Sequence, residues 1–462
     1  MGEQQQGTLF RPEFNGAVRV EASEAALSED AGALVLREVA ARLHLDDAVR
    51  EHLIDRRSAP HVVHSLTSLV RTAVLLMAQG WVDQDDADVL RGDRVFRVAV
   101  ADGGGARAAE RALASQPTLS RMVAMIADGS REGLHALVRG RAFADIRGLH
   151  GHRDEMTIDF DSYADAAHGH QEGVAYNGHF GEHVLHPLVA IADTGHFLDG
   201  VMRAGNAHTA ENVVAFAEPV IAGARELADT LWARFDAGFV APEFMDWLDE
   251  QRVRYVGRIR TNSVLQRHAA SWVARTRAVW AAAPSEVARE ATYEFWYRAK
   301  KWRRQRRVVA VLVERVPGDG ELFDRLFFLV SNAARPEATS AALLARYRQR
   351  GCAENHIGEF VNTIGSKVSS HFLRDNEVVL LLGLLAYNLV HHVRTRLARH
   401  LGEGVSLQRV RERFLKAASL VVRHARRVVV RIGQQKVAAW RSLVAALELA
   451  PRALATEGAA AV

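Results

Sequence analysis

Apolar residues recur at helical spacing through the first quarter of the chain. In segments 28–43 and 64–80 they return every three or four positions, which is the pattern of amphipathic helices. Ser28 stands where it would cap the first of these helices, and Gly80 where it would end the second. A third helix is expected to follow, with Pro117 in its first turn. Such a short helix suits DNA recognition and simple packing equally well.

Near position 155 the pattern changes to alternation. Ile158 and Phe160 are apolar, whereas Asp159 and Asp161 are acidic, so the two pairs face opposite sides of a strand. Strands and helices then alternate along the chain. We expect strands at 183–193, 197–205, 229–236 and 253–260, and helices at 208–228 and 241–251. This order predicts an α/β (α+β) protein with a mixed sheet flanked by helices.

Segment 265–336 has a different composition. It combines a basic run with stretches such as "VVAVLVERV" and "RLFFLVS", which are rich in β-branched and aromatic residues and favour strands. We interpret it as a β-rich basic insertion, after which the helical pattern returns with "SAALLARYRQRGCAENHIGEF".

Positive charge is concentrated in parts of the chain. The formal net charge is only +4, yet residues 300–307, "KKWRRQRR", hold six basic residues in eight positions. Between Arg394 and Arg431 there are eleven Lys or Arg against two Glu. Such clustering is typical of a nucleic-acid-binding surface, although two solvated basic faces would give the same counts.

Cysteine usage and hydropathy indicate the compartment. A single cysteine, Cys352, allows no intrachain disulfide and favours a reducing environment. The first residues contain no apolar signal core, and the longest apolar run, 378–390, is too short for a membrane span. We expect a soluble, cytoplasmic protein without membrane contact, in which 378–390 is a buried helix.

Three acidic residues stand where the predicted elements would bring them together. Asp161 ends the first strand, Asp236 ends a later strand, and Glu354 lies on a helix after the insertion. Carboxylates are the ligands that Mg²⁺ prefers, and a pair of such ions serves in-line phosphoryl transfer. Each acid alone is weak evidence, because the chain contains 55 Asp and Glu.

Several longer stretches resemble one known family. They are "HSLTSLVRTAVLLMAQGWVDQDDADVLRGD" and "LASQPTLSR" in the helical region, "DFDSYADAAHGHQEGVAYNGHFGEHVLHPLVAIADTGHFLDGVMRAGN", "ARFDAGF" with "YVGRIRTN", "YRQRGCAENHI" and "LAYNLV". From about Leu27 to Ile432 the chain resembles DDE transposases with an RNase H-like core, in the insertion-sequence 4 superfamily and closest to the insertion-sequence 1380 group.

The resemblance implies a role for individual residues. Asp161, Asp236 and Glu354 would hold two Mg²⁺ ions, with Mn²⁺ able to substitute. Asp159 is an alternative to Asp161, which we favour because the family's first ligand precedes a small hydroxylic residue, as Ser162 is here. The residues that would contact DNA are Tyr347, Arg350, Lys300, Lys301, Arg303, Arg304, Arg306, Arg307 and one of Trp296 and Trp302, stacked on an unpaired base. A core position is the other reading of either tryptophan.

This chain departs from the family pattern at two positions. The family has Thr where this chain has Tyr163, and Lys where it has Val361. Lys367 is the next lysine downstream. Both departures concern phosphate contacts more than metal ligation.

The resemblance also implies a division into regions. They are a helical N-terminal DNA-binding domain at 1–130, the first part of an RNase H-like catalytic core at 150–264, the basic insertion at 265–336, a helical second part of the core at 337–400 and a basic C-terminal region at 401–462. The whole would be a bacterial, nucleoid-associated transposase that acts as a homodimer on double-stranded DNA.

Two other classes of function remain as alternatives. The chain could be a catalytically silent, decayed or domesticated transposase that acts as a repressor or architectural protein, or a host RNase H-type nuclease. A zinc site is a weaker reading of His168, His170, His179, His183, His186 and His196, whose spacing fits no closed zinc pattern. We expect Cys352 to be a packing residue and Glu359 to be solvated.

Overall fold

The computed structural model describes most of the chain. The described residues are 8–10, 20, 21, 25, 27–83, 85–103, 108, 110–167, 169–283, 285–315, 325–365, 368–424 and 427–449. His168 and Lys367, two residues considered above, lie outside this part.

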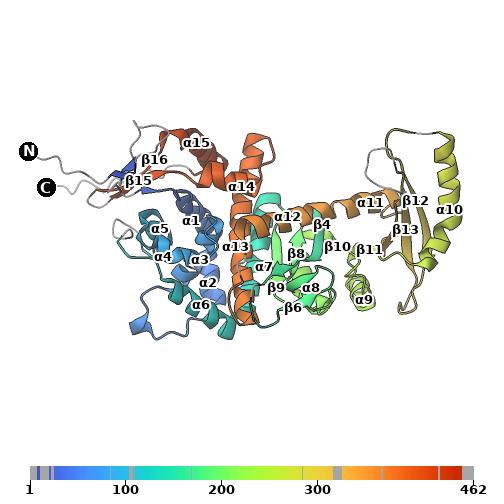
Figure 1. The fold of residues 1–462 in the computed structure, drawn as a ribbon, viewed down its shortest axis with the longest axis horizontal. Coiled ribbons are helices and arrows are strands. Elements are labelled where there is room, and N and C mark those ends of the chain that lie inside the picture. Colours follow the sequence, from blue (N-terminus) through green and yellow to red (C-terminus); the bar gives the residue numbers. More distant parts are fainter. Residues whose placement is uncertain are drawn as a thin grey trace, which may run out of the picture.

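A large mixed sheet forms the centre of the molecule (Figure 1). Its strands are β4 (Arg153–Ser162), β8 (Leu188–Ala192), β9 (Phe197–Val201), β10 (Ala228–Phe235), β11 (Arg254–Ile259), β12 (Glu290–Tyr297), β13 (Arg306–Val313) and β14 (Arg325–Ser331). They lie in the order β12-β13-β14-β11-β10-β4-β8-β9. The central strands β4, β10 and β11 are parallel, and the strands to either side are antiparallel to their neighbours. The predicted α/β class with a large mixed sheet is confirmed.

Helices cover both faces of this sheet. Alternate strand residues such as Phe160 pack on one face against α8 (Val213–Ala224) and α9 (Pro242–Glu250). Residues between them, such as Val189, pack on the other face in the same core as α13 (Leu373–Leu401). α11 (Ser340–Arg348) covers that face over β10 and β11. The alternation that predicted a strand in the sequence thus separates two cores.

The long helix α13 contains the apolar run at 378–390 (Figure 1). Among the described residues it is the one helix whose length and hydropathy would suit a membrane span, and 83% of its most apolar stretch is buried inside the protein. Residues 378–390 are all buried, which confirms the predicted core helix.

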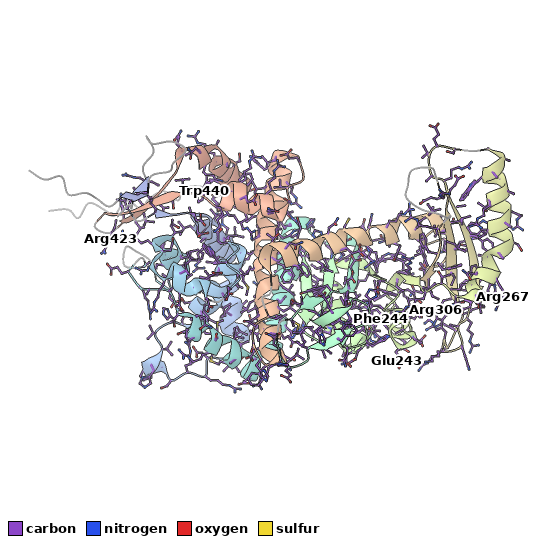
Figure 2. All side chains as sticks on the ribbon, viewed as in Figure 1. Glu243, Phe244, Arg267, Arg306, Arg423 and Trp440 are labelled. Atoms are coloured by element: carbon purple, nitrogen blue, oxygen red, sulfur yellow. The ribbon has the colours of Figure 1, made fainter. Side chains whose placement is uncertain are left out.

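Segment 265–336 contains more helix than its composition predicts. A 20-residue helix, α10 (Ser263–Ala282), precedes its strands. Leu265, Ala269 and Val273 are buried at a spacing of four residues, but exposed apolar residues such as Val264 and Val279 obscure this helical period. The three strands β12–β14 extend the central sheet through β14 and β11. In Figure 2, Arg267 and Arg306 mark this end of the molecule and Arg423 marks the opposite end.

The N- and C-terminal regions pack together at that opposite end. β3 (Leu27–Ser28) pairs with β15 (Ser419–His424), which forms a hairpin with β16 (Arg427–Ile432). The remaining elements of the C-terminal region are α14 (Leu407–Val410), a π-helical turn (Arg411–Leu415), a 3₁₀ turn (Gln434–Lys436) and α15 (Val437–Ala446). A short pair, β1 (Thr8–Phe10) and β2 (Val20–Glu21), precedes β3 in the chain. The basic C-terminal region therefore shares a sheet with the N-terminal part.

The N-terminal region is helical, as predicted. Its helices are α1 (Gly32–Arg42), α2 (Leu45–His52), α3 (Leu66–Ala78), α4 (Asp86–Val89), α5 (Arg94–Val100), α6 (Gln116–Gly129) and α7 (Arg131–His150), with 3₁₀ turns at Ala59–His61 and Leu90–Gly92. Pro117 lies in the first turn of α6, and Gly80 follows α3 with a φ of +88°. The expected Ser28 cap is wrong: Ser28 lies in β3, and Ala31 precedes α1 without a side-chain cap.

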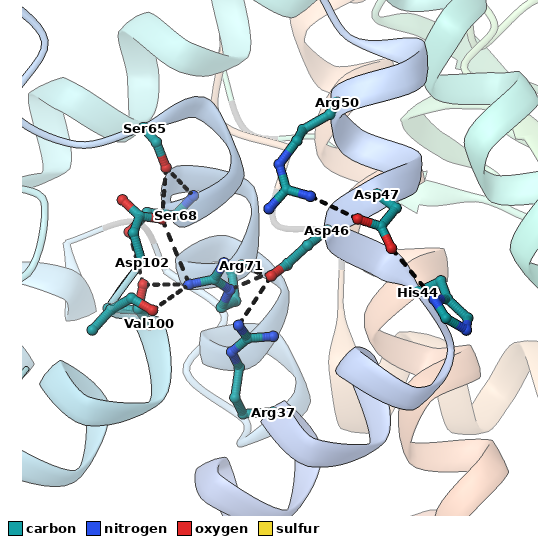
Figure 3. Close-up of polar contacts among 11 residues, drawn as sticks. Arg37, His44, Asp46, Asp47, Arg50, Ser65, Ser68, Arg71, Val100 and Asp102 are labelled. Atoms are coloured by element: carbon teal, nitrogen blue, oxygen red, sulfur yellow. Dashed lines mark hydrogen bonds and ion pairs between the residues drawn. The ribbon is translucent and has the colours of Figure 1, made fainter. Parts of the chain in front are cut away.

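A buried arginine ties three of these helices together (Figure 3). Arg71 of α3 is 2% exposed and donates hydrogen bonds to Asp46 of α2 and to the carbonyl oxygens of Val100, the last residue of α5, and of Ala101, which follows it. Asp46 also accepts a hydrogen bond from Arg37 of α1 at 3.0 Å. A buried charge that is hydrogen-bonded on all sides fixes the positions of its partners.

Candidate active site

Two of the predicted acidic residues stand side by side at the ends of parallel strands. Phe160 of β4 pairs with Phe235 of β10, so the next residues along the two strands, Asp161 and Asp236, lie at the same level of the sheet. Phe160 and Phe235 point into the core under α8 and α9. Because side chains alternate along a strand, Asp161 and Asp236 point to the other face. Asp236 then accepts a hydrogen bond from the Gly238 amide at 2.8 Å, which begins the turn after β10.

The third acidic residue comes from the helix over that face. Glu354 lies on α12 (Arg350–Glu359), one turn after Arg350. Ala353 and Ile357 are buried in the core on the other side of this helix. Residues four positions apart share one face of a helix, so Arg350 and Glu354 are presented together, and the Glu354 side chain is 54% exposed.

These residues line one cavity of about 620 Å³. It contains Asp161, Asp236, Glu354, Arg350 and Arg260, together with the hairpin residues Tyr176–Phe180, His186 and the loop Asn206–Thr209. The structure therefore brings the three predicted ligands to one cavity, although they are separated by 75 and 118 positions in the chain.

Arg350 supplies the positive charge at this site. Its guanidinium donates a hydrogen bond to Asp161 Oδ2 at 2.6 Å and also pairs with Glu354. Burial raises the pKa of Asp161 to about 7, against the lowering effects of Arg350 and the Ser162 amide, and the neighbouring carboxylates of Asp236 and Asp159 add to the rise. The carboxylate at the end of β4 is thus short of compensating positive charge.

Asp159, the alternative first ligand, has a different environment. It forms a two-fold ion pair with Arg234 of β10, with both N–O distances at 2.6 Å. Both residues are buried, and Arg234 also donates to the Arg346 carbonyl at 2.6 Å. Asp159 does not line the cavity. This arrangement favours Asp161 as the metal ligand. Asp159 instead holds Arg234, which connects the sheet to the end of α11.

His186 orients the residue next to Asp161. One ring nitrogen, Nδ1, lies 3.2 Å from the Ala207 carbonyl and the other, Nε2, lies 3.0 Å from Ser162 Oγ. A carbonyl only accepts, so Nδ1 carries a proton. Burial lowers the pKa of His186, so the ring is neutral and Nε2 accepts the hydrogen bond from Ser162. The histidine thereby links the end of β4 to the loop that closes the cavity.

The donor set suits a hard divalent cation. Three carboxylates offer oxygen ligands of the kind that Mg²⁺ and Mn²⁺ take, and the charge deficit at Asp161 favours a bound cation. Within the described part of the chain, no three His, Cys, Asp or Glu side chains converge closely enough to bind one ion. Arg350 lies between Asp161 and Glu354, so a metal ion would have to displace its guanidinium.

The predicted DNA-contacting residues of the insertion separate into two groups. Lys300, Lys301, Arg303 and Arg304 are exposed in the turn between β12 and β13. Arg306 and Arg307 are 2% and 3% exposed. Arg306 pairs with Asp246 and Asp249, and Arg307 pairs with Glu294. In this structure Arg306 connects β13 to α9 and Arg307 connects it to β12. Both guanidinium groups are buried, so they are not available to contact DNA.

The two tryptophans also differ. Trp302 is 5% exposed and lies edge-on against Tyr297, with Arg306 over its ring, which is the core position considered above as the other reading. Trp296 is 62% exposed and lines a separate cavity of about 480 Å³ together with Arg304 and Asp249.

Other predicted residues take varied places. Tyr347 is half-buried next to Arg350, outside the cavity lining, and burial raises its pKa. The prediction for Cys352 is wrong, because it is exposed. The prediction for Glu359 is also wrong: burial opposes its ionisation, yet hydrogen bonds and the charge of Arg394 lower its pKa to about 2. Of the six histidines considered for zinc, His196 is buried against Asp145, and the described residues hold no zinc-like group.

Some cavity residues had no place in the sequence-based prediction. Arg260 follows β11, and its position was open to prediction because β11 is parallel to β10 and ends at the same edge. Tyr176 and Phe180 lie in a hairpin between β6 (Ala175–Asn177) and β7 (Glu182–Leu185), which pairs with β5 (Asp165–Ala166) in a separate small sheet. Nothing in their spacing indicates the cavity, because the fold of this small sheet brings them to it.

Comparison with known proteins assigns the chain to a family. Residues 10–451 match the family model described as "Transposase DDE domain group 1", and the chain belongs to that family. A search of curated proteins gives no match. Among solved structures, the chain is similar to the piggyBac transposase in a cryo-EM synaptic complex with hairpin DNA, at 12% identity over 83% of this chain and 76% of that one, with a TM-score of 0.41.

Proposed function

We propose that this protein is an active transposase of an insertion sequence in the insertion-sequence 4 superfamily, closest to the 1380 group. It binds the terminal inverted repeats as a homodimer, cuts the DNA and joins the freed 3′-OH ends to target DNA. The observation that carries this proposal is the single cavity lined by Asp161, Asp236, Glu354 and Arg350 in a chain of the DDE transposase family.

Asp161, Asp236 and Glu354 would hold the divalent ions, two Mg²⁺ or Mn²⁺. Ions held there would supply activation of the attacking water or 3′-OH and stabilisation of the departing oxygen. The guanidinium of Arg350 is in reach of both Asp161 and Glu354, and its fork geometry suits a phosphate. Arg260, on the next strand end, adds a second positive charge to the same cavity. These two arginines would orient the scissile phosphate toward the carboxylates.

The test is cleavage of a duplex that carries the element end, taken from the DNA flanking the gene, with Mg²⁺ or Mn²⁺. The wild type should nick this duplex, whereas Asp161→Asn, Asp236→Asn and Glu354→Gln should each lose at least about a thousandfold in rate while still binding it. Asp154→Asn is a matched control, because Asp154 is an exposed aspartate near the start of the same strand. Normal cutting by Asp236→Asn would show that the site is assigned wrongly.

The same assay separates the other classes of function. Specific binding of the element end without cutting by the wild type, at any concentration of either metal, would establish a silent DNA-binding protein. Degradation of RNA–DNA hybrids without preference for an end sequence would indicate a host RNase H-type nuclease.

A further inference from the structure

The catalytic cavity has an aromatic side that the proposed hydrolysis does not use. Tyr176 and Phe180 of the β6–β7 hairpin line the same space as Asp161, Asp236 and Glu354. Their exposed fractions are 58% and 37%. Large aromatic side chains that stay exposed in a cavity are costly to leave uncovered, so the hairpin points to a ligand with a flat apolar surface.

Neither ring is covered by a parallel partner within the described part of the chain. Phe180 makes edge contacts with His179 and His186, at centroid distances of 4.9 and 5.7 Å. Tyr176 makes an edge contact with His183 at 5.6 Å. Edge contacts fix the orientation of a ring, and both residues stay exposed and line the cavity.

The hairpin is held firmly at its base. Gly205 donates a hydrogen bond to the Gly173 carbonyl at 2.9 Å and accepts one from the Asn177 side chain at 2.7 Å. A Cβ atom at Gly205 would lie 2.0 Å from the Val184 carbonyl oxygen, so only glycine permits this approach of the two chains. At the tip, Gly181 has a φ of +77° and donates to the Asn177 carbonyl. The two aromatic rings therefore project from a preorganised support.

A polar group that suits the edge of a flat ligand lies in the same cavity. Asn206 lines it and is exposed, and its side-chain amide makes no hydrogen bond with any of the described residues. An amide offers one acceptor and two donors, which is the combination that reads the edge of a nucleobase. Exposed aromatic residues in the same cavity as an amide that has no partner among the described residues are the combination found in sites for single-stranded nucleic acid.

We propose that Tyr176 and Phe180 bind an unstacked nucleobase, from a nucleotide next to the phosphate that the carboxylates receive. This inference rests on the proposed function, because it takes a DNA strand to lie at Asp161, Asp236 and Glu354. It places the base on the β6–β7 hairpin, not on the insertion, where Trp302 is buried and Trp296 lines another cavity.

The test compares two fluorescent single strands of roughly eight units, one of thymidines and one of abasic sugar phosphates, with Ca²⁺ as the divalent cation. The full-length wild type should bind the thymidine strand about 5- to 100-fold more tightly, the range that base–aromatic stacking gives. Tyr176→Ala with Phe180→Ala should lose most of this preference, whereas Tyr176→Phe with Phe180→Tyr should keep it. A 2-aminopurine in the strand should be quenched by the wild type and by the conservative variant only.

Phe372→Ala is the matched control, because Phe372 is a 47% exposed ring outside the cavity lining, and this variant should keep the full preference. Equal binding of both strands by the wild type would overturn the inference, as would a preserved preference in the folded double alanine variant. Binding of duplex element ends without any binding of single strands would also overturn it and leave the proposed function intact. Failure to bind DNA of any kind would overturn both.

Discussion

The Arg350 guanidinium donates a hydrogen bond to the Asp161 carboxylate at 2.6 Å and also contacts Glu354. This arginine therefore compensates part of the negative charge of two of the three carboxylates to which we assign metal ions. Three carboxylates around one cavity repel one another without a cation. In this structure the cationic group is the guanidinium of Arg350, which lies on the same helix as Glu354. Metal ions and Arg350 would compete for the same oxygens.

The first prediction follows from this competition. Arg350→Gln should bind Mn²⁺ more tightly than the wild type in the absence of DNA, by about tenfold, the scale on which one nearby charge alters the affinity of a carboxylate for a cation. The same variant should cut DNA much more slowly, because the phosphate loses a partner. Isothermal titration calorimetry measures the first effect without any need for activity.

Arg348→Gln provides the control for that measurement. Arg348 lies on the preceding helix and pairs with Glu290 of β12, so its loss should leave Mn²⁺ affinity unchanged. If wild type and Arg350→Gln bound Mn²⁺ with equal affinity, the Arg350 guanidinium would not compete with the metal ion for the carboxylate oxygens of Asp161 and Glu354.

The second prediction separates Asp159 from Asp161. Asp159→Ala leaves Arg234 buried without its partner, and breaking a buried ion pair in this way costs about 3–5 kcal/mol of unfolding free energy. Asp161→Asn should cost little stability, because burial already disfavours its charge, but it should abolish cutting. Urea denaturation of both variants, followed by the cleavage assay, checks the pair of outcomes. A stable, inactive Asp159→Ala would reverse the assignment.

The pattern of apolar and polar residues predicted the strands of the central sheet well. Side chains of each strand alternate between two faces with different surroundings, and this alternation is visible in the sequence. The alternation around Asp161 predicted which face of the strand its side chain occupies. In the structure, the parallel pairing of β4 with β10 then brings Asp236 to the same level. The approach of Glu354 depends on how α12 packs, through Ala353 and Ile357, and the resemblance to a family supplied it where spacing alone did not.

Ion pairing is what the sequence conceals. Arg306 and Arg307 belong to a run that resembles one basic surface. Alternation along β13 points them to opposite faces, and each is buried with an acidic partner, Asp246 for Arg306 and Glu294 for Arg307. Glu359 reads as a surface charge, yet its partner Arg394 lies 35 positions away on α13. Such partners are set by tertiary contacts between segments remote in the chain, so local composition does not indicate which charges remain free.

The third prediction concerns a buried histidine away from the site. His135 of α7 lies 2.7 Å from Asp199 of β9 and 3.4 Å from Glu377 of α13. Burial opposes its charge, but hydrogen bonds to the two carboxylates raise its pKa to about 9. Its ordinary value is 6.5, and the difference corresponds to roughly 3 kcal/mol.

Because the folded-state pKa is raised, this stabilisation is fully present below about pH 6.5 and is lost as the pH rises through about 9. The free energy of unfolding measured in urea should therefore fall between pH 7 and 10 by more in the wild type than in His135→Gln. At pH 6, where the wild-type histidine is charged, His135→Gln should be the less stable of the two. His152→Gln, at an exposed histidine paired with Asp229, should follow the wild type. Parallel pH profiles for wild type and His135→Gln would contradict the assigned charge.

The last prediction concerns the basic run in the insertion. Lys300→Gln with Lys301→Gln removes two exposed charges from the β12–β13 turn. If that turn lies on DNA, the slope of log affinity against log salt should become shallower by about 1.8, or 0.9 for each phosphate that a lysine no longer neutralises.

Arg306→Gln should instead lower the urea midpoint, because it leaves Asp246 without its buried partner, and should keep the wild-type salt slope while the protein is folded. A filter-binding titration of duplex DNA over a range of salt concentrations measures the slopes. An unchanged slope in the double lysine variant would remove this turn from the DNA interface and leave the exposed charges near the cavity, such as Arg260, to bind the phosphates.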